Sequence, residues 1–256
     1  MLKVCVSGAT GWTGGAVAEA VVAAQDMELV SAVSRRAAGD QVLGAPCFAS
    51  VAEALDGPGF EVLIDYTALS VVEANTHAAI AAGKRVVIGT SGLTAAEFEG
   101  IDAAARKAGT GVVASGNFAL TAALMTRFSL MAAEYLDWFE IIDYSRPSKT
   151  DAPTGTAREL AERMGKVRQP AYEVDPAEVK GEPGLRGGTI AGVQVHALRL
   201  PSYSATVTST FALGNSRLTI THDASKDPTI YADGTLLAAR KVMDIQGLVR
   251  GLDQLL

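Results

Sequence analysis

The sequence has few of the residues that by themselves would indicate a metal centre or a disulfide framework. Its 256 residues include two cysteines and three histidines. Cys5 and Cys47 belong to no Cys-x-x-Cys pair, so we expect two thiols that are buried or incidental rather than a disulfide. The histidines, His77, His196 and His222, lie far apart and lack the spacing of zinc ligands. The sequence therefore predicts no metal site.

A basic surplus and a long uninterrupted apolar run are also missing. The formal net charge is −6, whereas proteins that bind nucleic acids more often carry an excess of lysine and arginine. The most apolar run, from Phe118 to Phe139, is interrupted by Arg127, Glu134 and Asp137, so it predicts a buried helix rather than a membrane span. The first residues do not have the regions of a signal peptide. We therefore expect a cytoplasmic protein with no nucleic-acid or membrane partner.

Strand-like and helix-like segments alternate through the first 118 residues. Short apolar segments that end in glycine or polar residues are typical of strands, and segments with helical spacing lie between them. This alternation with short connections is typical of a parallel sheet covered on both faces. The strand-like segments are residues 2–8, 27–36, 60–67, 84–92 and 111–118.

The pattern changes after residue 118. A long apolar helix is expected to run to about Asp137, and a strand at residues 139–145 and a helix at residues 158–164 follow it. Three later segments alternate apolar and polar residues, which predicts an antiparallel sheet on which His196 and His222 are structural. The tail, from about Pro228, predicts a helix.

These patterns predict an α/β fold with two domains. Residues 1–117 and 227–256 are expected to form a Rossmann-type parallel-sheet domain that binds a dinucleotide. Residues 118–226 are expected to form an α+β domain with an open mixed or antiparallel sheet.

A glycine-rich turn connects the first strand to the first helix. The glycines of SGATGWTGG have the spacing G-x-x-G-x-x-G. Glycine permits a tight turn and a close approach of the backbone to a pyrophosphate, which the free N–H groups of a helix start can bind. The same pattern would also serve a turn needed only for helix–sheet packing. The candidate dinucleotide contacts are Gly8, Thr10, Gly11, Trp12, Thr13 and Gly14.

The residues after the second strand bear on the choice of dinucleotide. A fold selective for NAD usually has an acidic residue there, which bonds the ribose 2′-hydroxyl. This chain has Ser34, Arg35 and Arg36 instead. A guanidinium binds phosphate in a fork, so we expect NADPH to be preferred, with NADH as the alternative cofactor. A solvated charged loop is the other interpretation of these residues.

The stretch DYSRPSKTDAPTGTA, residues 143–157, combines cations and hydroxyl groups in front of a predicted helix. A helix start offers unpaired N–H groups and the positive end of a dipole. Thr154 and Thr156 add hydroxyl donors, and Lys149 and Arg146 add charge. The stretch therefore predicts a site for one or two carboxylates, although a capped helix behind a solvated loop would have a similar sequence.

Motifs spread along nearly the whole chain resemble those of one known family. They are the glycine turn, Asp65-Tyr66-Thr67, Gly89-Thr90-Ser91-Gly92, Gly116-Asn117-Phe118 and the run KTDAPTGTA at residues 149–157. In these motifs the chain resembles the dihydrodipicolinate reductase (4-hydroxy-tetrahydrodipicolinate reductase) family of lysine biosynthesis, whose own form of the last run is K-x-D-A-P-S-G-T-A.

The resemblance implies a fold, a reaction and an assembly. It implies a Rossmann domain completed by a C-terminal helix, and a middle domain that binds substrate and whose sheet mediates formation of a homotetramer. It also implies hydride transfer from a nicotinamide to a small cyclic imine dicarboxylate.

The resemblance also implies roles for particular residues. Lys149, Thr154, Gly155 and Thr156 would bind a substrate carboxylate, with Arg146 as a further candidate. Thr67 and the segment Gly89, Thr90, Ser91 and Gly92 would line the nicotinamide end of the cofactor. Tyr66, Asn117 and Phe118 are further candidate contacts of the cofactor.

The chain departs from the family at the expected proton donor. The usual bacterial form has a His-His pair just before the lysine segment, and here these positions are Ser145 and Arg146. Ala119 likewise replaces a serine that usually follows the Phe of the Asn-Phe segment. The remaining candidates for the proton donor are Lys149, Tyr144 and a water molecule held by Ser145.

Three functions remain open at this point. The chain is either a reductase of the lysine pathway that works without the histidine, a reductase of a different imine, or a protein that binds NADPH without turnover. An extended short-chain dehydrogenase is disfavoured, because such enzymes need Tyr-x-x-x-Lys and none of the six tyrosines has a lysine four residues later.

Overall fold

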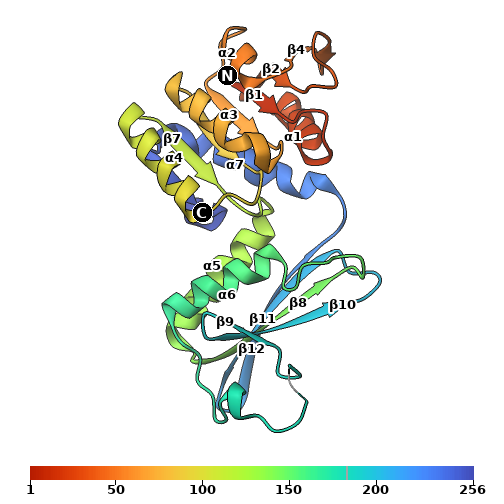
Figure 1. Cartoon of the computed structure of the whole chain (residues 1–256), viewed down its shortest axis with the longest axis vertical. Coiled ribbons are helices and arrows are strands. Elements are labelled where there is room, and N and C mark those ends of the chain that lie inside the picture. The colour runs from red at the N-terminus through yellow and green to blue at the C-terminus, as the bar shows by residue number, and fades with distance from the viewer. Residues whose placement is uncertain (183) are drawn as a thin grey trace. The chain divides into compact units, whose positions relative to one another are not determined.

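The computed structural model describes residues 1–182 and 184–256, and it divides into two compact units. Unit 1 comprises Met1–Leu120 and Asp227–Leu256, and unit 2 comprises Thr121–Lys226. Each unit is built around its own sheet (Figure 1). Within the described residues, no helix has the length and apolar character needed to cross a membrane.

An eight-stranded sheet forms the centre of unit 1, in the order β13-β7-β6-β5-β1-β2-β4-β3. All described pairings are parallel except that of β3 with β4. The inner strands β5 and β7 are buried along their whole length, as expected of parallel strands covered on both faces. The strands are β1 (Leu2–Ser7), β2 (Met27–Val33), β3 (Gln41–Val42), β4 (Ala45–Phe48), β5 (Val62–Asp65), β6 (Arg85–Ile88), β7 (Gly111–Ala114) and β13 (Gly247–Arg250).

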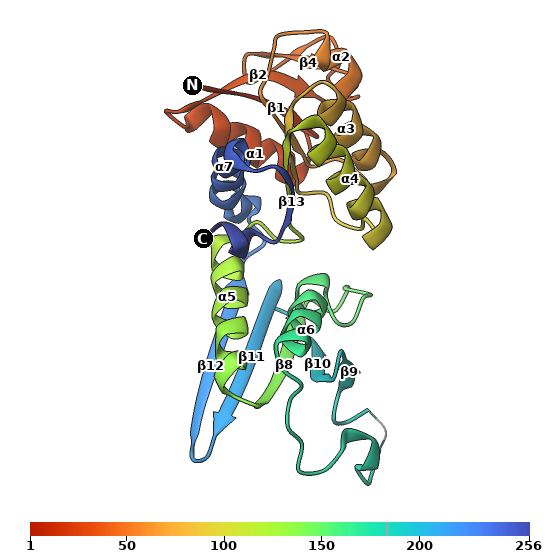
Figure 2. The same ribbon diagram turned by 90° about the vertical axis from the view of Figure 1, so that its left-hand side faces the viewer.

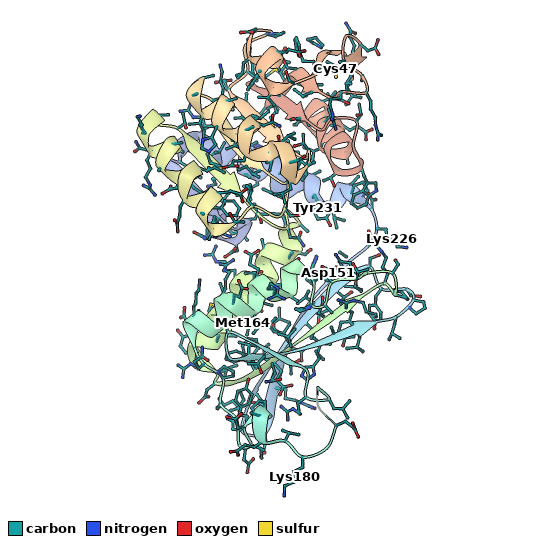
Figure 3. All side chains as sticks on the ribbon, in the orientation of Figure 1. Cys47, Asp151, Met164, Lys180, Lys226 and Tyr231 are labelled. Carbon is teal, nitrogen blue, oxygen red and sulfur yellow. The ribbon has the colours of Figure 1, made fainter. Side chains whose placement is uncertain are left out.

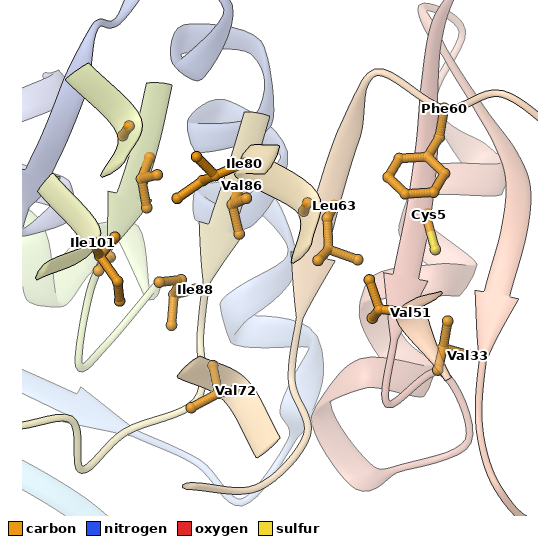
Figure 4. Packing of buried hydrophobic residues seen from close by; sticks show 14 of the residues in the cluster. Cys5, Val33, Val51, Phe60, Leu63, Val72, Ile80, Val86, Ile88 and Ile101 are labelled. Atoms are coloured by element: carbon orange, nitrogen blue, oxygen red, sulfur yellow. The ribbon is translucent and has the colours of Figure 1, made fainter. Parts of the chain in front are cut away.

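Helices cover both faces of this sheet. Helices α1 and α7 lie on one side, and α2, α3 and α4 lie on the other (Figure 2). Figure 4 shows the apolar core under the second group, where Phe60, Leu63 and Ile101 are among the buried residues. The helices are α1 (Trp12–Ala23), α2 (Val51–Leu55), α3 (Leu69–Ala81), α4 (Ala95–Ala108) and α7 (Ala232–Lys241).

Unit 2 contains a five-stranded sheet in the order β12-β11-β8-β10-β9. Helices α5 and α6 share an apolar cluster with β8, β10 and β11, in which Met125, Ile141 and Leu160 are at most 2% exposed. This cluster covers one face of the sheet. The elements are α5 (Leu120–Tyr135), β8 (Trp138–Ser145), α6 (Gly155–Val167), β9 (Gly188–Ile190), β10 (Val193–Arg199), β11 (Ala205–Leu213) and β12 (Ser216–Ala224).

The sheet of unit 2 is mixed, so the purely antiparallel arrangement expected for the last three segments is wrong in part. Strand β10 runs parallel to β8, whereas β11 pairs antiparallel with both β8 and β12. A parallel pair requires a long crossover connection, and the chain from α6 to β9 provides it. The mixed form of the predicted α+β domain is thus the correct one, and the predicted α/β class is confirmed.

Three details of the sequence-based elements also need correction. Cys47 lies on β4, which was not among the expected strands. The hairpin of β3 and β4 was not expected, and the tail forms strand β13 after its helix. The two cysteines are free and buried, and burial strongly raises the pKa of the Cys5 thiol.

Candidate functional site

The glycine turn of unit 1 folds so tightly that side chains are excluded from it. Gly8 has φ +83° and Gly11 N–H donates to the Gly8 carbonyl at 2.8 Å. A Cβ atom on Gly8 would overlap the carbonyl oxygen of Tyr66, and one on Gly14 would overlap the carbonyl oxygen of Gly8. The spacing of the glycines therefore reflects close backbone packing between β1, β5 and α1.

The start of α1 offers N–H groups to a ligand. Gly11 is the N-cap residue, and no side chain caps the helix. Strand β1 lies between β2 and β5, where the strand order reverses, and ligands of open α/β sheets bind at this point. The residues thus fit the phosphates of a dinucleotide, which a helix N-terminus binds well.

The segment after β2 lies next to this turn. The Thr10 and Ser34 hydroxyl groups are 2.6 Å apart, and Ser34 is buried. Arg35 and Arg36 follow and are both exposed. Neither guanidinium has a hydrogen bond or ion pair with the part of the chain that the structure describes. They are therefore available to an anionic ligand near the glycine turn.

The buried carboxylate of Asp65 organises the loops that follow β5 and β6. It is fully buried, and it accepts hydrogen bonds from Thr67 N–H (3.0 Å), Thr67 Oγ1 (2.6 Å), Thr90 Oγ1 (2.9 Å) and Asn75 Nδ2 (2.8 Å). The hydroxyl groups of Thr67 and Thr90, which were predicted to line the nicotinamide end of the cofactor, thus donate to the protein itself. Their role here is to hold the two loops together, while Ser91 is exposed in the second loop.

A cavity of about 180 Å³ lies within unit 1 beside these loops. The Tyr66 hydroxyl is 2.6 Å from the Thr235 hydroxyl, and Trp12 contacts the Tyr231 ring edge-on with centroids 6.3 Å apart. Asn117 Oδ1 accepts from Ala119 N–H at 2.9 Å, which shapes the loop after β7. The cavity is lined by Trp12, Thr13, Tyr66, Gly89, Gly116, Asn117, Phe118 and Tyr231.

Most residues of that lining are predicted cofactor contacts. Gly116 and Tyr231 are the exceptions. Gly116 was named only as part of a family motif, and Tyr231 belongs to the C-terminal segment, where nothing in the local sequence indicated its role. Only the return of the chain to unit 1 after unit 2 brings Tyr231 to the cavity. The structure therefore gathers distant motifs at one end of the sheet.

In unit 2, the predicted anion-binding stretch is organised around the buried Asp143. Its carboxylate accepts hydrogen bonds from Thr154 N–H (2.9 Å) and Thr154 Oγ1 (2.7 Å). It also forms an ion pair with Arg199 at 2.9 Å. The donors of Thr154 are thus already used within the protein. Gly155 and Thr156, the first residues of α6, present the helix-start N–H groups that lack intrahelical partners.

The loop before α6 carries an exposed ion pair. Lys149 Nζ lies 2.7 Å from Asp151 Oδ1, and these side chains are 35% and 48% exposed. The hydrogen bond from Lys149 lowers the pKa of the Asp151 carboxyl group. Arg146 Nε donates to the Ser148 hydroxyl at 3.1 Å. Figure 3 shows Asp151 before the start of α6 and Met164 toward the end of this helix.

Ser145 and Tyr144 lie at the end of β8 and already have partners. The Ser145 hydroxyl is buried and donates to the Ser204 carbonyl at 2.9 Å. Side chains alternate between the faces of a strand, so Tyr144 points away from the face that holds Asp143. Its ring stacks on Tyr203 with centroids 4.8 Å apart.

Two of the three histidines have partners that agree with the structural role expected from the sequence. His222 Nδ1 is 3.0 Å from the Thr121 hydroxyl, and burial lowers the pKa of this histidine. His196 Nε2 is 2.7 Å from Glu140 Oε2. Across residues 1–182 and 184–256, no group of three or more His, Cys, Asp or Glu side chains is arranged to hold a metal ion.

Arg199 and Asp143 are residues that sequence reasoning missed. Asp143 is the first residue of the stretch 143–157, but an acidic residue beside a predicted anion site does not by itself indicate a role. Arg199 lies 56 positions away on β10, and only the pairing of β10 with β8 brings it to Asp143.

Two family profiles together match almost the entire chain. The profile of the dihydrodipicolinate reductase N-terminus matches residues 2–118, and the profile of its C-terminus matches residues 121–256. The chain belongs to the dihydrodipicolinate reductase family. With its Rossmann-type sheet, it is an NAD(P)H-dependent reductase of this family, so the family and the enzyme class predicted from the sequence are confirmed.

Individual dihydrodipicolinate reductases match over the full length. The chain is 34% identical over 264 residues to the 4-hydroxy-tetrahydrodipicolinate reductase of Desulfitobacterium hafniense (strain DSM 10664 / DCB-2), covering 100% of this chain and 98% of the relative. It is also 34% identical over 273 residues to the enzyme of the same name from Picosynechococcus sp. (strain ATCC 27264 / PCC 7002 / PR-6), with the same coverage.

Solved structures agree with this assignment. The dipicolinate-bound dihydrodipicolinate reductase of Paenisporosarcina sp. TG-14 superposes with a TM-score of 0.89 at 28% identity, and the match covers 100% of both chains. The NAD complex of GenD2 from gentamicin A biosynthesis has a TM-score of 0.67 at 17% identity, covering 99% of this chain and 90% of GenD2, and shows the shared fold alone.

Proposed function

We propose that this protein reduces 4-hydroxy-tetrahydrodipicolinate to tetrahydrodipicolinate with NADPH, in lysine and diaminopimelate biosynthesis. The observation that carries the proposal is the loop of residues 146–156, which presents Lys149 and the start of α6 together. A dicarboxylate needs such a combination of charge and helix N–H donors. Relatives with the same reductase name match the chain from end to end.

Different residues of the chain would bind the cofactor and the substrate. The start of α1 and the Gly8 to Gly14 turn would hold the phosphates of NADPH, and the cavity of unit 1 would take its nicotinamide. When bound, the reduced nicotinamide supplies the hydride. Lys149, Gly155 and Thr156 would bind a substrate carboxylate, because the polar groups of Thr154 are engaged with Asp143.

Conversion of 4-hydroxy-tetrahydrodipicolinate to tetrahydrodipicolinate takes up one hydride and one proton and releases the 4-hydroxyl group as water, and we propose that Lys149 provides the proton. The Lys149 side chain is partly exposed, so water or a substrate carboxylate can replace the Asp151 carboxylate as the partner of its ammonium group. The Ser145 hydroxyl is buried against Ser204, and Tyr144 stacks on Tyr203. A cyclic imine that arrives protonated needs mainly positioning, which Lys149 would supply in either case.

The preference for NADPH is tested by replacing the two exposed arginines. Arg35→Ala combined with Arg36→Ala is expected to weaken NADPH binding by about 10–100-fold, which corresponds to the loss of one charge-assisted hydrogen bond to phosphate of about 1.5–3 kcal/mol. NADH lacks the 2′-phosphate, so its affinity is expected to change little. Fluorescence titration of both dinucleotides measures this ratio. Equal losses for NADPH and NADH would contradict the phosphate assignment.

The substrate is tested by NADPH oxidation with freshly generated 4-hydroxy-tetrahydrodipicolinate beside a panel of other cyclic imines. Rapid turnover with the first compound and slow turnover with the rest is the expected result. No NADPH oxidation with 4-hydroxy-tetrahydrodipicolinate, together with turnover of another imine, would contradict the proposed substrate.

A second candidate function follows from the residues that replace the family's histidine pair. Ser145 and Arg146 stand at these positions, and Arg146 bonds to Ser148 within the loop. Another cation beside Lys149 favours a substrate with additional negative charge. The imine panel therefore includes substrates with a third carboxylate, and faster turnover of these would favour this second function.

We further propose that the protein is a cytoplasmic homotetramer. The support is the face of the unit 2 sheet opposite α5 and α6, where Trp138 and Leu198 are 43% and 37% exposed. A cavity of about 660 Å³ opens on this face, and an open sheet face of this kind is stabilised by a partner surface. A monomeric mass by light scattering would contradict the tetramer.

A further inference from the structure

We propose that Arg199 is a positioning residue for substrate binding: paired with the buried Asp143, it holds the main chain of the loop that carries Lys149. The inference rests on the proposed function, because it assigns the substrate carboxylate to this loop. Arg199 touches neither Lys149 nor the N–H groups of Gly155 and Thr156 in the described contacts. It acts through Asp143 and Asp151.

The carboxylate of Asp143 needs compensation because it is completely buried. Its relative exposure is 0%, and a buried charge is tolerated only when it is paired and hydrogen-bonded. Thr154 provides two donors at the N-cap of α6, and Arg199 provides the positive charge. Asp143 thereby fixes the position at which α6 begins.

The guanidinium group of Arg199 forms hydrogen bonds with three parts of the chain: β8, the loop before α6, and its own strand β10. One of its terminal nitrogens, Nη2, donates both to Asp143 Oδ2 at 2.9 Å and to the carbonyl of Asp151 at 2.7 Å. Nη1 donates to the carbonyl of Leu198 at 2.8 Å. The side chain is only 18% exposed. A guanidinium can make these contacts at once, whereas a lysine ammonium is a compact point charge with a different geometry.

The contact with Asp151 relates Arg199 to substrate binding. The carbonyl of Asp151 is fixed by Arg199, while its carboxylate pairs with Lys149. Exposed ion pairs are weak, so a substrate carboxylate can replace the Asp151 carboxylate on Lys149. The main chain of Asp151 stays in place during this exchange, because Arg199 holds it from the buried side.

The test compares Arg199→Lys with the wild-type enzyme. Lysine keeps a positive charge near Asp143, but its Nζ is one bond closer to Cα than Nη2 of Arg199, so it is not expected to reach both the Asp143 carboxylate and the Asp151 carbonyl. We expect the KM for substrate and the Kd for pyridine-2,6-dicarboxylate to rise about 10–100-fold, while kcat falls much less and the KM for NADPH stays within about twofold. Arg217→Lys, at an exposed position of β12 in the same sheet, is the matched control and is expected to change none of these values.

A second variant separates positioning from a general loss of structure. Arg199→Ala is expected to lose binding of pyridine-2,6-dicarboxylate and to regain part of it when guanidinium is added at millimolar concentration, because the free cation can occupy the vacated place. A merely structural arginine would instead give a lower melting temperature with no recovery of binding. Unchanged KM and Kd in Arg199→Lys, or no recovery in a folded Arg199→Ala, would overturn the proposal.

Binding of pyridine-2,6-dicarboxylate keeps this test distinct from the test of the substrate. Absence of turnover with 4-hydroxy-tetrahydrodipicolinate in the wild-type enzyme, together with dicarboxylate binding that depends on Arg199, would refute the proposed substrate and support the positioning role. Turnover of 4-hydroxy-tetrahydrodipicolinate by the wild-type enzyme, together with dicarboxylate binding that does not depend on Arg199, would support the proposed substrate and refute the positioning role.

Discussion

Lys149→Ala is expected to lower turnover by about 10²–10⁴-fold, the range typical of a lost general acid, while NADPH affinity stays near the wild-type value. Lys149 belongs to unit 2, whereas the glycine turn belongs to unit 1. The Lys149 side chain is the only ammonium group in the loop of residues 146–156, since the other cation, Arg146, is a guanidinium, which is not deprotonated in proteins. Steady-state kinetics with 4-hydroxy-tetrahydrodipicolinate, and fluorescence titration with NADPH, measure the two effects.

Two further variants separate the roles of Lys149. Lys149→Arg keeps a cation that can bind a carboxylate, but a guanidinium is not deprotonated in proteins and is a poor proton donor. It is expected to retain binding of pyridine-2,6-dicarboxylate and to lose turnover. Lys166→Ala, at an exposed position near the end of α6, is the matched control. Turnover of Lys149→Ala equal to that of this control would exclude Lys149 from the reaction.

Gly14→Ala is expected to abolish most dinucleotide binding and to destabilise unit 1. A Cβ atom there would overlap the Gly8 carbonyl oxygen, so α1 must move away from the turn. Overpacking of this kind lowers the free energy of unfolding by about 1–3 kcal/mol, and a loss of about 3 kcal/mol in binding corresponds to about 100-fold in Kd. Titration with NADPH and urea unfolding measure the two changes.

The neighbouring glycine provides a matched control. A Cβ atom on Gly15 would lie 3.5 Å from the Ala9 carbonyl oxygen, an ordinary contact. Alanine is preferred over glycine inside a helix by about 0.5–1 kcal/mol, so Gly15→Ala is expected to keep NADPH binding and to be slightly more stable. Equal effects of the two substitutions would show that close packing at Gly14 is not what the dinucleotide site requires.

The elements that sequence reasoning predicted well are those whose signal is local. Apolar strands that end in glycine or polar residues, such as β1 and β5, are buried as their composition indicates, apart from the first two residues of β1. The apolar run broken by Arg127, Glu134 and Asp137 contains α5. The N-cap of α6 falls at Thr154, within the stretch of residues 143–157 that was expected to lead into a helix. Periodicity and turn residues act over a few consecutive positions, so they can be recognised in a single sequence.

The elements that were missed depend on pairing between distant segments. Strand β4 carries Cys47 and adds to the sheet only through its parallel pairing with β2. Strand β13 is short and pairs with β7, which lies more than a hundred residues earlier. The parallel pairing of β8 with β10 follows from the route of the chain after α6. None of these partners is encoded in the local pattern of the strand itself.

The sequence by itself determined the α/β class, the glycine turn, the family motifs and the cations of the loop before α6, because each of these depends on residue type and short spacing. Only the tertiary structure decided where the hydrogen-bond donors are directed. Thr154 donates to Asp143, Thr67 and Thr90 donate to Asp65, and Arg199 joins Asp143 to Asp151. A buried carboxylate must be paired wherever the fold places it, and that place is set by packing over distances along the chain that no local motif records.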